Sequence, residues 1–301
     1  MKIASLFHNP QAGSEDHSRK ELIELLSNND IECRYSSTKE KGWKDEEIDP
    51  ESDMVIIAGG DGTIRNVVKK LMKRSLVDKQ LKIGLLPLGT ANNISKTLGV
   101  TKDLPAMVNS WKNGNSKKFD VGRLYNVSEE NFFIESFGYG IFPYLMLEMK
   151  KQASEEIEED PDKKLQLALK LMHEIVLSYK PRECRLIIDG KDFSGTFLLA
   201  EVMNTRSIGP NINLAPLSDP GDGDLEVVLL KENDKEHFAE YVKNLQEGND
   251  APFKFESIKG KKISITWDGT HVHVDDEAIK IEKGSEVKIE ILKGLITFLV
   301  P

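Results

Sequence analysis

The sequence is poor in cysteine and lacks long apolar runs. Among its 301 residues only Cys33 and Cys184 are cysteines, and neither has a Cys or His at the spacing of a zinc site. Two isolated thiols are typical of a reduced protein rather than of a disulfide scaffold. No run approaches the roughly 20 apolar residues of a transmembrane helix, and the first ten residues are too poor in apolar side chains for a signal peptide. We therefore expect a cytoplasmic chain.

Positive charge is also in short supply. The chain has 41 Lys and Arg against 50 Asp and Glu, which gives a formal net charge of −9. This balance disfavours non-specific binding of nucleic acid and permanent electrostatic docking on anionic lipid. We therefore expect no nucleic-acid partner. The hydrophobic share of 39% is that of an ordinary globular protein, and the length is near the limit at which one core divides into two.

Strand-like and helix-like segments alternate in the first part of the chain. Buried strands are expected at 2–7, 54–58 and 81–86, and helices at 17–28, 64–72 and 91–98. Such alternation predicts a three-layer α/β domain with a parallel sheet. After residue 119 short strands dominate, which predicts an antiparallel β-sandwich domain. One helical stretch, 164–179, interrupts these strands, and Asp189-Gly190 and Asp268-Gly269 are expected to form hairpin turns. The predicted domains are 1–122 with a returning strand at 294–301, and 123–293.

A glycine loop, Gly59-Gly60-Asp61-Gly62-Thr63, ends one expected strand and begins a helix. Glycines let main-chain N–H groups approach a phosphate, and the helix N-terminus adds positive potential. The spacing is neither GxGxxG nor GxxxxGK[ST], so neither a dinucleotide oxidoreductase nor a P-loop enzyme is indicated. A simpler alternative is a turn in which Asp61 caps the helix that follows it.

A second loop, Gly89-Thr90-Ala91-Asn92-Asn93, follows the next expected strand. Its Thr and Asn side chains suit phosphate oxygens or ribose hydroxyls, although helix capping by Thr90 or Asn92 would explain the loop alone. Phosphate ligands of parallel sheets bind beyond the carboxyl ends of the strands. Two such loops on successive strands therefore predict a shared phosphate cleft.

The ordered set of motifs resembles the diacylglycerol kinase catalytic family, which includes sphingosine and ceramide kinases and bacterial soluble lipid kinases. The similar segments extend along almost the whole chain: NPQAG at 9–13, GGDGT at 59–63 followed by NVV at 66–68, PLGTANN at 87–93, FDVG at 119–122, Asn204 with Gly209, AP at 215–216 and DGDLEV at 222–227. No single segment would suffice, because each is short.

The resemblance implies an enzyme that binds ATP with Mg²⁺ and transfers the γ-phosphate to the hydroxyl of diacylglycerol or a related lipid alcohol. It places nucleotide phosphate at Asn9, Gly59, Gly60, Gly62, Thr63, Gly89, Thr90 and Asn92. It also implies that Asp61 and Asp120 organise Mg²⁺ near the transferred group. Asp219, Asp222 and Asp224 would form a structural Mg²⁺ site, although a plain surface turn explains these three nearly as well.

The family carries Asp-Gly-Glu near the end of its β domain, and Asp275-Asp276-Glu277 stands at that position. By resemblance Asp275 is the general base for the lipid hydroxyl, Glu277 orients it or assists the metal, and Asp61 is the next candidate for the base. An acidic turn between two strands is the alternative. The sequence departs from the family at Asn93, where Asp is usual, and at Asp276, where Gly is usual.

Two histidines, His271 and His273, lie two apart on one expected strand and so face the same side. No third ligand is identifiable, which favours a hydrogen-bonding or packing role over a metal pair.

We therefore expect a lipid kinase that contacts the membrane surface transiently. The alternatives are a kinase of a sphingoid base or a non-lipid alcohol, and a catalytically weakened nucleotide-binding module. The sequence sets no oligomeric state, and a dimer is compatible with it.

Overall fold

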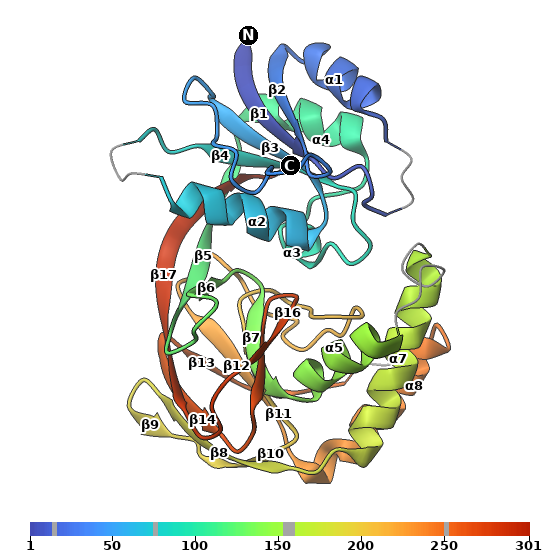
Figure 1. The fold of residues 1–301 in the computed structure, drawn as a ribbon, viewed down its shortest axis with the longest axis vertical. Coiled ribbons are helices and arrows are strands. Elements are labelled where there is room, and N and C mark those ends of the chain that lie inside the picture. The colour runs from blue at the N-terminus through green and yellow to red at the C-terminus, as the bar shows by residue number, and fades with distance from the viewer. Residues whose placement is uncertain (14–16, 75–77, 153–159, 250–252) are drawn as a thin grey trace. The chain divides into compact units, whose positions relative to one another are not determined.

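The computed structural model describes residues 1–13, 17–74, 78–152, 160–249 and 253–301. The chain divides into two compact units, Met1–Phe119 with Gly294–Pro301, and Asp120–Lys293. It passes from one unit to the other within two strands, β5 (Ser116–Tyr125) and β17 (Glu286–Leu299) (Figure 1). The second passage returns the C-terminal strand to the first unit.

The first unit is built on a parallel sheet. Its strands lie in the order β17, β4, β3, β1, β2, and the pairings between them are parallel. The remaining strand bounds are β1 (Lys2–His8), β2 (Ile31–Ser37), β3 (Met54–Gly59) and β4 (Lys82–Pro87). β3 is buried along its whole length, as expected for a strand covered on both faces. The predicted α/β domain with a parallel sheet is confirmed.

Helices cover both faces of this sheet (Figure 1). They are α1 (Arg19–Ser27), α2 (Asp61–Met72), α3 (Asn93–Thr97) and α4 (Leu104–Ser110), the last followed by a short 3₁₀ turn, η1 (Trp111–Asn113). Val108 of α4 belongs to the same buried cluster as Leu6 and Ile56 of the sheet. Lys70 of α2, in contrast, lies over the ring of Phe7. Because neighbouring residues of a strand point to opposite faces, α2 and α4 lie on opposite sides of the sheet.

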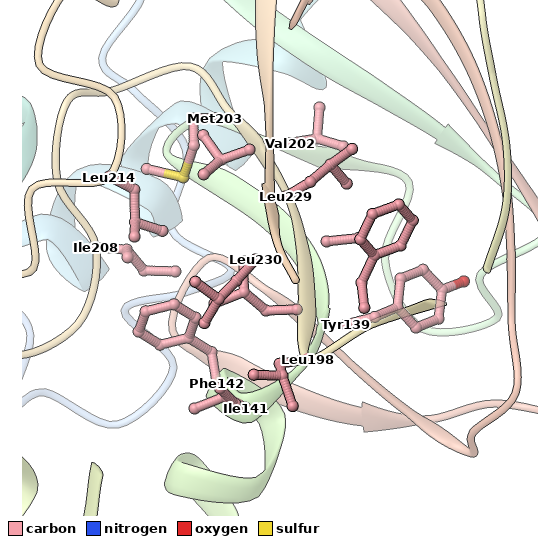
Figure 2. Close-up of a cluster of buried hydrophobic side chains, with 14 of the residues drawn as sticks. Tyr139, Ile141, Phe142, Leu198, Val202, Met203, Ile208, Leu214, Leu229 and Leu230 are labelled. Carbon is pink, nitrogen blue, oxygen red and sulfur yellow. The ribbon is translucent and has the colours of Figure 1, made fainter. Parts of the chain in front are cut away.

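The second unit is antiparallel. One of its sheets has the strand order β13, β12, β11, β7, β15, β16, and a second group runs β10, β8, β14, β17. The pairings within both groups are antiparallel. Figure 2 shows part of the unit's apolar core, including Tyr139 and Val202 from neighbouring strands. The predicted antiparallel β domain is confirmed. Its strands are β6 (Phe132–Phe133), β7 (Ser136–Gly140), β8 (Arg182–Ile188), β9 (Lys191–Asp192), β10 (Gly195–Phe197), β11 (Leu199–Met203), β12 (Leu225–Leu230), β13 (Glu256–Gly260), β14 (Lys262–Trp267), β15 (His271–Val274) and β16 (Glu277–Lys280).

The expectation of one helix in this unit is wrong. The described residues include α5 (Ile141–Gln152), α7 (Pro161–Ser178) and α8 (Lys235–Gln246), with a 3₁₀ turn, η2 (Glu232–Asp234), before the last. α5 follows β7 without a break, and Pro143 in its first turn weakens the helical signal in the sequence. Proline is nevertheless tolerated in a first helical turn. α8 has a detectable signal, because its buried residues Phe238, Ala239, Tyr241 and Val242 follow helical spacing. No helix of the described ranges is long and apolar enough to cross a membrane.

Of the two expected hairpin turns, one is correct. Asp189-Gly190 joins the paired strands β8 and β9, with φ of 47° and 81° at its two residues. Asp268-Gly269 instead lies between β14 and β15, which belong to different sheets. The dipeptide pattern was the same, but strand pairing on each side decided the outcome.

The returning strand provides a test of the core of the first unit. Phe298 is fully buried and packs edge-to-face on Phe119, with ring centroids 5.1 Å apart. Phe298→Ala should lower the free energy of unfolding by about 3–5 kcal/mol, the usual cost of emptying an aromatic site. Denaturant titration measures this loss. Leu295→Ala, on the same strand at a side chain that is 47% exposed, is the control. Equal losses in the two variants would contradict the assignment of the strand to the core.

Candidate functional site

Two glycine loops of the first unit lie directly against each other at the carboxyl ends of β3 and β4. A β-carbon placed on Gly89 would lie 2.5 Å from the Gly60 Cα, and one on Gly60 would lie 3.2 Å from the Gly89 Cα. The Leu88 N–H also donates to the Gly59 carbonyl at 3.1 Å. Only glycine at position 89 permits this approach, which leaves the main chain of both loops without side-chain cover at the contact.

A third loop, at 9–13, joins the first two. The Asn9 N–H donates to the Ala58 carbonyl at 2.8 Å, next to the first glycine loop. Gly13 has a φ of +64°, and a β-carbon there would lie 2.3 Å from the Leu88 oxygen. The Asn9 side chain accepts from the Gln11 N–H at 3.1 Å and so stabilises the turn itself. The three segments predicted to hold nucleotide in this unit are thus assembled in one place.

Asp61 links the two glycine loops through its carboxylate. It accepts hydrogen bonds from the N–H groups of Asn93 at 2.8 Å and Ile94 at 3.1 Å. These are the first donors of α3, whose own N-cap, Asn92, has a φ of 51° and makes no side-chain capping bond. Asp61 therefore caps α3, not the helix it begins, and this role was not foreseen from the sequence.

The other predicted residues of the loops differ in their exposure. Thr63 is buried, with its hydroxyl packed on Gly59, whereas Thr90 is exposed. The Asn92 amide donates to the Gly89 carbonyl at 2.5 Å. Its Oδ1 atom is buried without a hydrogen-bond partner in the described part of the chain. Gly62 lies in the first turn of α2, where main-chain N–H groups point out of the helix end.

In the second unit, Asp275 occupies a nest of main-chain donors. Its carboxylate accepts from Ile134, Glu135 and Ser136, with the shortest bond, 2.8 Å, from the Glu135 N–H. Three consecutive N–H groups stabilise an ionised carboxylate. The side chain is only 4% exposed. The same residue donates its own N–H to the Ser136 carbonyl at 2.8 Å, which fixes it to β7.

Asp275 and Asp276 form the two-residue turn between β15 and β16. Asp275 has a φ of 53°, in the left-handed region, whereas the φ of Asp276 is not positive. The aspartate that replaces the family's glycine is therefore accommodated without backbone strain. Asp276 and Glu277 are both exposed, in contrast to Asp275.

The remaining acidic residues surround one loop of the second unit. Asp120 is fully buried and accepts from the Gly223 N–H at 2.8 Å. Asp222 pairs with Lys259 at 2.7 Å, and Asp224 lies 3.8 Å from Lys261. Asp219 accepts from the Gly221 N–H at 3.0 Å within its own turn. These contacts do not decide between a metal site and the plain surface turn that the sequence left open, and both stay predictions.

The second unit also contains a buried ionisable pair that the sequence did not predict. His273 Nε2 lies 2.7 Å from Glu201 Oε2, and neither side chain is exposed to solvent. Burial lowers the pKa of His273, but the Glu201 carboxylate and the hydrogen bonds of the ring outweigh this and raise it overall. Burial raises the pKa of Glu201. The residues are 72 positions apart, so no local pattern could pair them.

Comparison with protein families covers both units. Residues 4–124 match the model described as the diacylglycerol kinase catalytic domain. Residues 151–289 match the YegS C-terminal NAD kinase beta sandwich-like domain. The chain belongs to the diacylglycerol kinase catalytic-domain family. The resemblance found in the sequence motifs is thereby confirmed, and the chain is a member of a lipid-kinase family.

Individual relatives match nearly the whole chain. A Bacillus subtilis (strain 168) protein named diacylglycerol kinase is 27% identical over 305 residues, covering 97% of this chain and 86% of its own length. A diacylglycerol kinase structure from Bacillus anthracis str. Sterne has a TM-score of 0.71 at 20% identity, covering 100% of this chain and 97% of that one. An NAD kinase from Archaeoglobus fulgidus, solved in complex with ATP, has a TM-score of 0.53 at 12% identity, covering 99% and 93%. At these identities the two solved structures show a shared fold.

The family implies a nucleotide and a divalent cation, and the residues present suit the first more fully. The glycine contact and the first turn of α2 leave main-chain groups of the kind that accept phosphate, and the unpartnered Asn92 Oδ1 can accept a hydrogen bond from a hydroxyl or a water. Among the described residues, no three His, Cys, Asp or Glu side chains are grouped to hold a metal. Magnesium bound with a nucleotide needs only one or two carboxylates besides phosphate and water. Asp61 can provide one, whereas a resident metal at Asp219, Asp222 and Asp224 stays a prediction.

The capping role of Asp61 can be measured as stability. Asp61→Ala removes the acceptor of two α3 donors and should lower the free energy of unfolding by about 0.5–2 kcal/mol, as for other helix caps. Asp61→Asn should lose less, because its amide oxygen can still accept. Asp103→Ala is the matched control, since that carboxylate caps α4 through the Ala106 N–H at 3.0 Å. An Asp61→Ala variant as stable as wild type would show that the link between the loops is not formed in solution.

Proposed function

We propose that this chain is an ATP-dependent lipid kinase that transfers the γ-phosphate to the hydroxyl of diacylglycerol or a related lipid alcohol. The observation that carries the proposal is the contact between Gly60 and Gly89, because it exposes two main-chain loops where parallel sheets bind phosphate. The name of the Bacillus subtilis relative supports the lipid substrate, and the ATP complex of the NAD kinase supports the nucleotide.

In this proposal the nucleotide, with its metal, supplies the phosphoryl group. The N-terminal turn of α2 and the loop at Gly89 hold the phosphates, with Thr90 and Asn92 as neutral side-chain donors. The lipid hydroxyl oxygen forms a bond to the γ-phosphorus as the bond to the bridging oxygen breaks and ADP leaves. The hydroxyl proton passes to Asp275.

The nest around Asp275 suits a base that must be ionised before reaction. The N–H groups of Ile134, Glu135 and Ser136 all contact Oδ1, and that of Ile134 also lies 3.2 Å from Oδ2. Glu277, exposed at the start of β16, is proposed to orient the acceptor or assist the metal, and Asp120 to order the loop that precedes Asp224.

The acceptor decides between the lipid-kinase proposal and its alternatives. The protein should transfer label from γ-labelled ATP to diacylglycerol presented in vesicles, in keeping with a cytoplasmic enzyme that contacts the membrane transiently. Parallel reactions contain a sphingoid base and soluble alcohols. Transfer only to the sphingoid base or to a soluble alcohol would show that the acceptor is not diacylglycerol. Nucleotide binding without transfer to any acceptor would favour a nucleotide-binding module, an outcome for which Asn93 in place of the family's carboxylate gives a reason.

The glycine contact generates a prediction about affinity. Gly89→Ala forces the two loops apart and should raise the Kd for ATP about tenfold to a hundredfold, because hydrogen bonds to charged groups contribute about 1.5–3 kcal/mol. Calorimetry measures the change. Gly114→Ala is the control, since that glycine has a φ of +74° and open space around its Cα. It should lose stability through backbone strain but bind ATP normally. Unchanged affinity in a folded Gly89→Ala variant would count against phosphate binding at this contact.

The base generates a prediction about rate. Asp275→Asn keeps the shape of the side chain and removes its basicity, so kcat should fall about 10²- to 10⁴-fold with little change in ATP affinity. Asp276→Asn, at the exposed neighbouring position of the same turn, should leave kcat nearly unchanged. If Asp276→Asn were the more damaging substitution, the base would be misassigned. If both variants kept full activity, Asp61 would become the next candidate.

A further inference from the structure

The buried pair of His273 and Glu201 spans the strand that lies between them. Glu201 of β11 and His273 of β15 both stand opposite Gly138 of β7, one on each side of it. A β-carbon on Gly138 would lie 2.0 Å from a Glu201 carboxylate oxygen. The missing side chain therefore leaves the space through which the carboxylate reaches the imidazole. Phe142 of α5 lies edge-on to the ring of His273, with centroids 6.1 Å apart, and belongs to the apolar core shown in Figure 2.

The second nitrogen of His273 contacts the turn that carries the proposed base. Nδ1 lies 3.0 Å from the main-chain oxygen of Asp275. A carbonyl oxygen can only accept, so Nδ1 carries a proton and donates to it. The contact between Nε2 and Glu201 holds one further proton, on the ring or on the carboxyl group. Either arrangement leaves the Nδ1 donor unchanged, and the pair as a whole is neutral.

Asp275 needs such an anchor because its backbone is held in an uncommon conformation. A non-glycine residue with positive φ costs roughly 1–2 kcal/mol, and it persists only where its surroundings fix it. The Asp275 N–H is fixed by Ser136 and its carboxylate by the nest at 134–136. The carbonyl is the remaining polar group of the residue, and His273 holds it.

We propose that His273, fixed by Glu201, is a positioning residue that keeps Asp275 in the left-handed turn and so keeps its carboxylate aligned for proton transfer. The proposal rests on the proposed function for its catalytic consequence. Its structural part, the link from His273 through the Asp275 carbonyl to the nest, can be tested without any assay of activity.

Two substitutions separate the two ring contacts. Asn at position 273 places an amide nitrogen near the site of Nδ1, whereas Gln places one near the site of Nε2. Both are made in a Glu201→Gln background, so that neither leaves an unpaired buried charge. His273→Asn should then retain most of the kcat of the Glu201→Gln protein. His273→Gln should lose about 10²-fold in kcat, the scale of a misplacement of about 1 Å, with the KM for ATP unchanged. His271→Gln, on the same strand but partly exposed, is the matched control.

Amide hydrogen exchange gives the readout that does not depend on activity. Exchange at Ile134, Glu135 and Ser136 should accelerate in the His273→Gln protein and stay slow in the His273→Asn protein. Equal exchange in the two proteins would overturn the link from His273 to the nest. This result would hold even if the wild-type protein transferred no phosphate to any lipid. Altered exchange with equal kcat in an active enzyme would overturn the positioning role while leaving the proposed function intact. Should His273→Gln not fold, ¹⁵N chemical shifts of wild-type His273 decide the matter, because an unprotonated Nδ1 contradicts the proposal.

Discussion

The close approach of Gly60 and Gly89 is the constraint on which the first unit's site depends. Two adjacent parallel strands end side by side, and only glycines let their outgoing loops touch. Asp61 then joins the loops by capping α3, a helix too short to be stable alone. In the proposed function the same residues therefore serve both the fold and the ligand. Main-chain donors are exposed where we propose that phosphate binds, and the Asp61 carboxylate links the two loops that carry them.

In the second unit, main-chain groups hold the candidate side chain of Asp275 in place. As the proposed base, Asp275 must be held in place and yet be ionised, and three main-chain N–H groups suit both needs. Its turn lies at the end of β15, and His273, a buried polar residue of that strand, is paired across β7. Gly138 gives the space for that pairing, because it has no side chain to occupy it.

Much of the fold and the family could be predicted from the sequence, because periodicity and motif order can be read from the chain itself. The alternation of apolar runs predicted the parallel sheet, and the ordered motifs predicted the family that the comparisons confirm. The capping of α3 by Asp61 could not be predicted, since it joins residues 32 positions apart. The pairing of His273 with Glu201 was not predicted, and the hairpin predicted at Asp268-Gly269 was wrong. Both have the same cause, because both depend on which strands become neighbours. The roles of the individual site residues stay predictions.

A crystal structure with a non-hydrolysable ATP analogue and Mg²⁺ tests the central claim most directly. We expect the phosphates to lie on the main chain at Gly60 and Gly89, within hydrogen-bonding distance of the first turn of α2. We also expect Asn92 Oδ1 to gain a partner from the nucleotide or its water, and the bond from Asp61 to the Asn93 N–H to persist. Phosphates bound elsewhere, with the glycine contact unchanged and uncovered, would contradict the account.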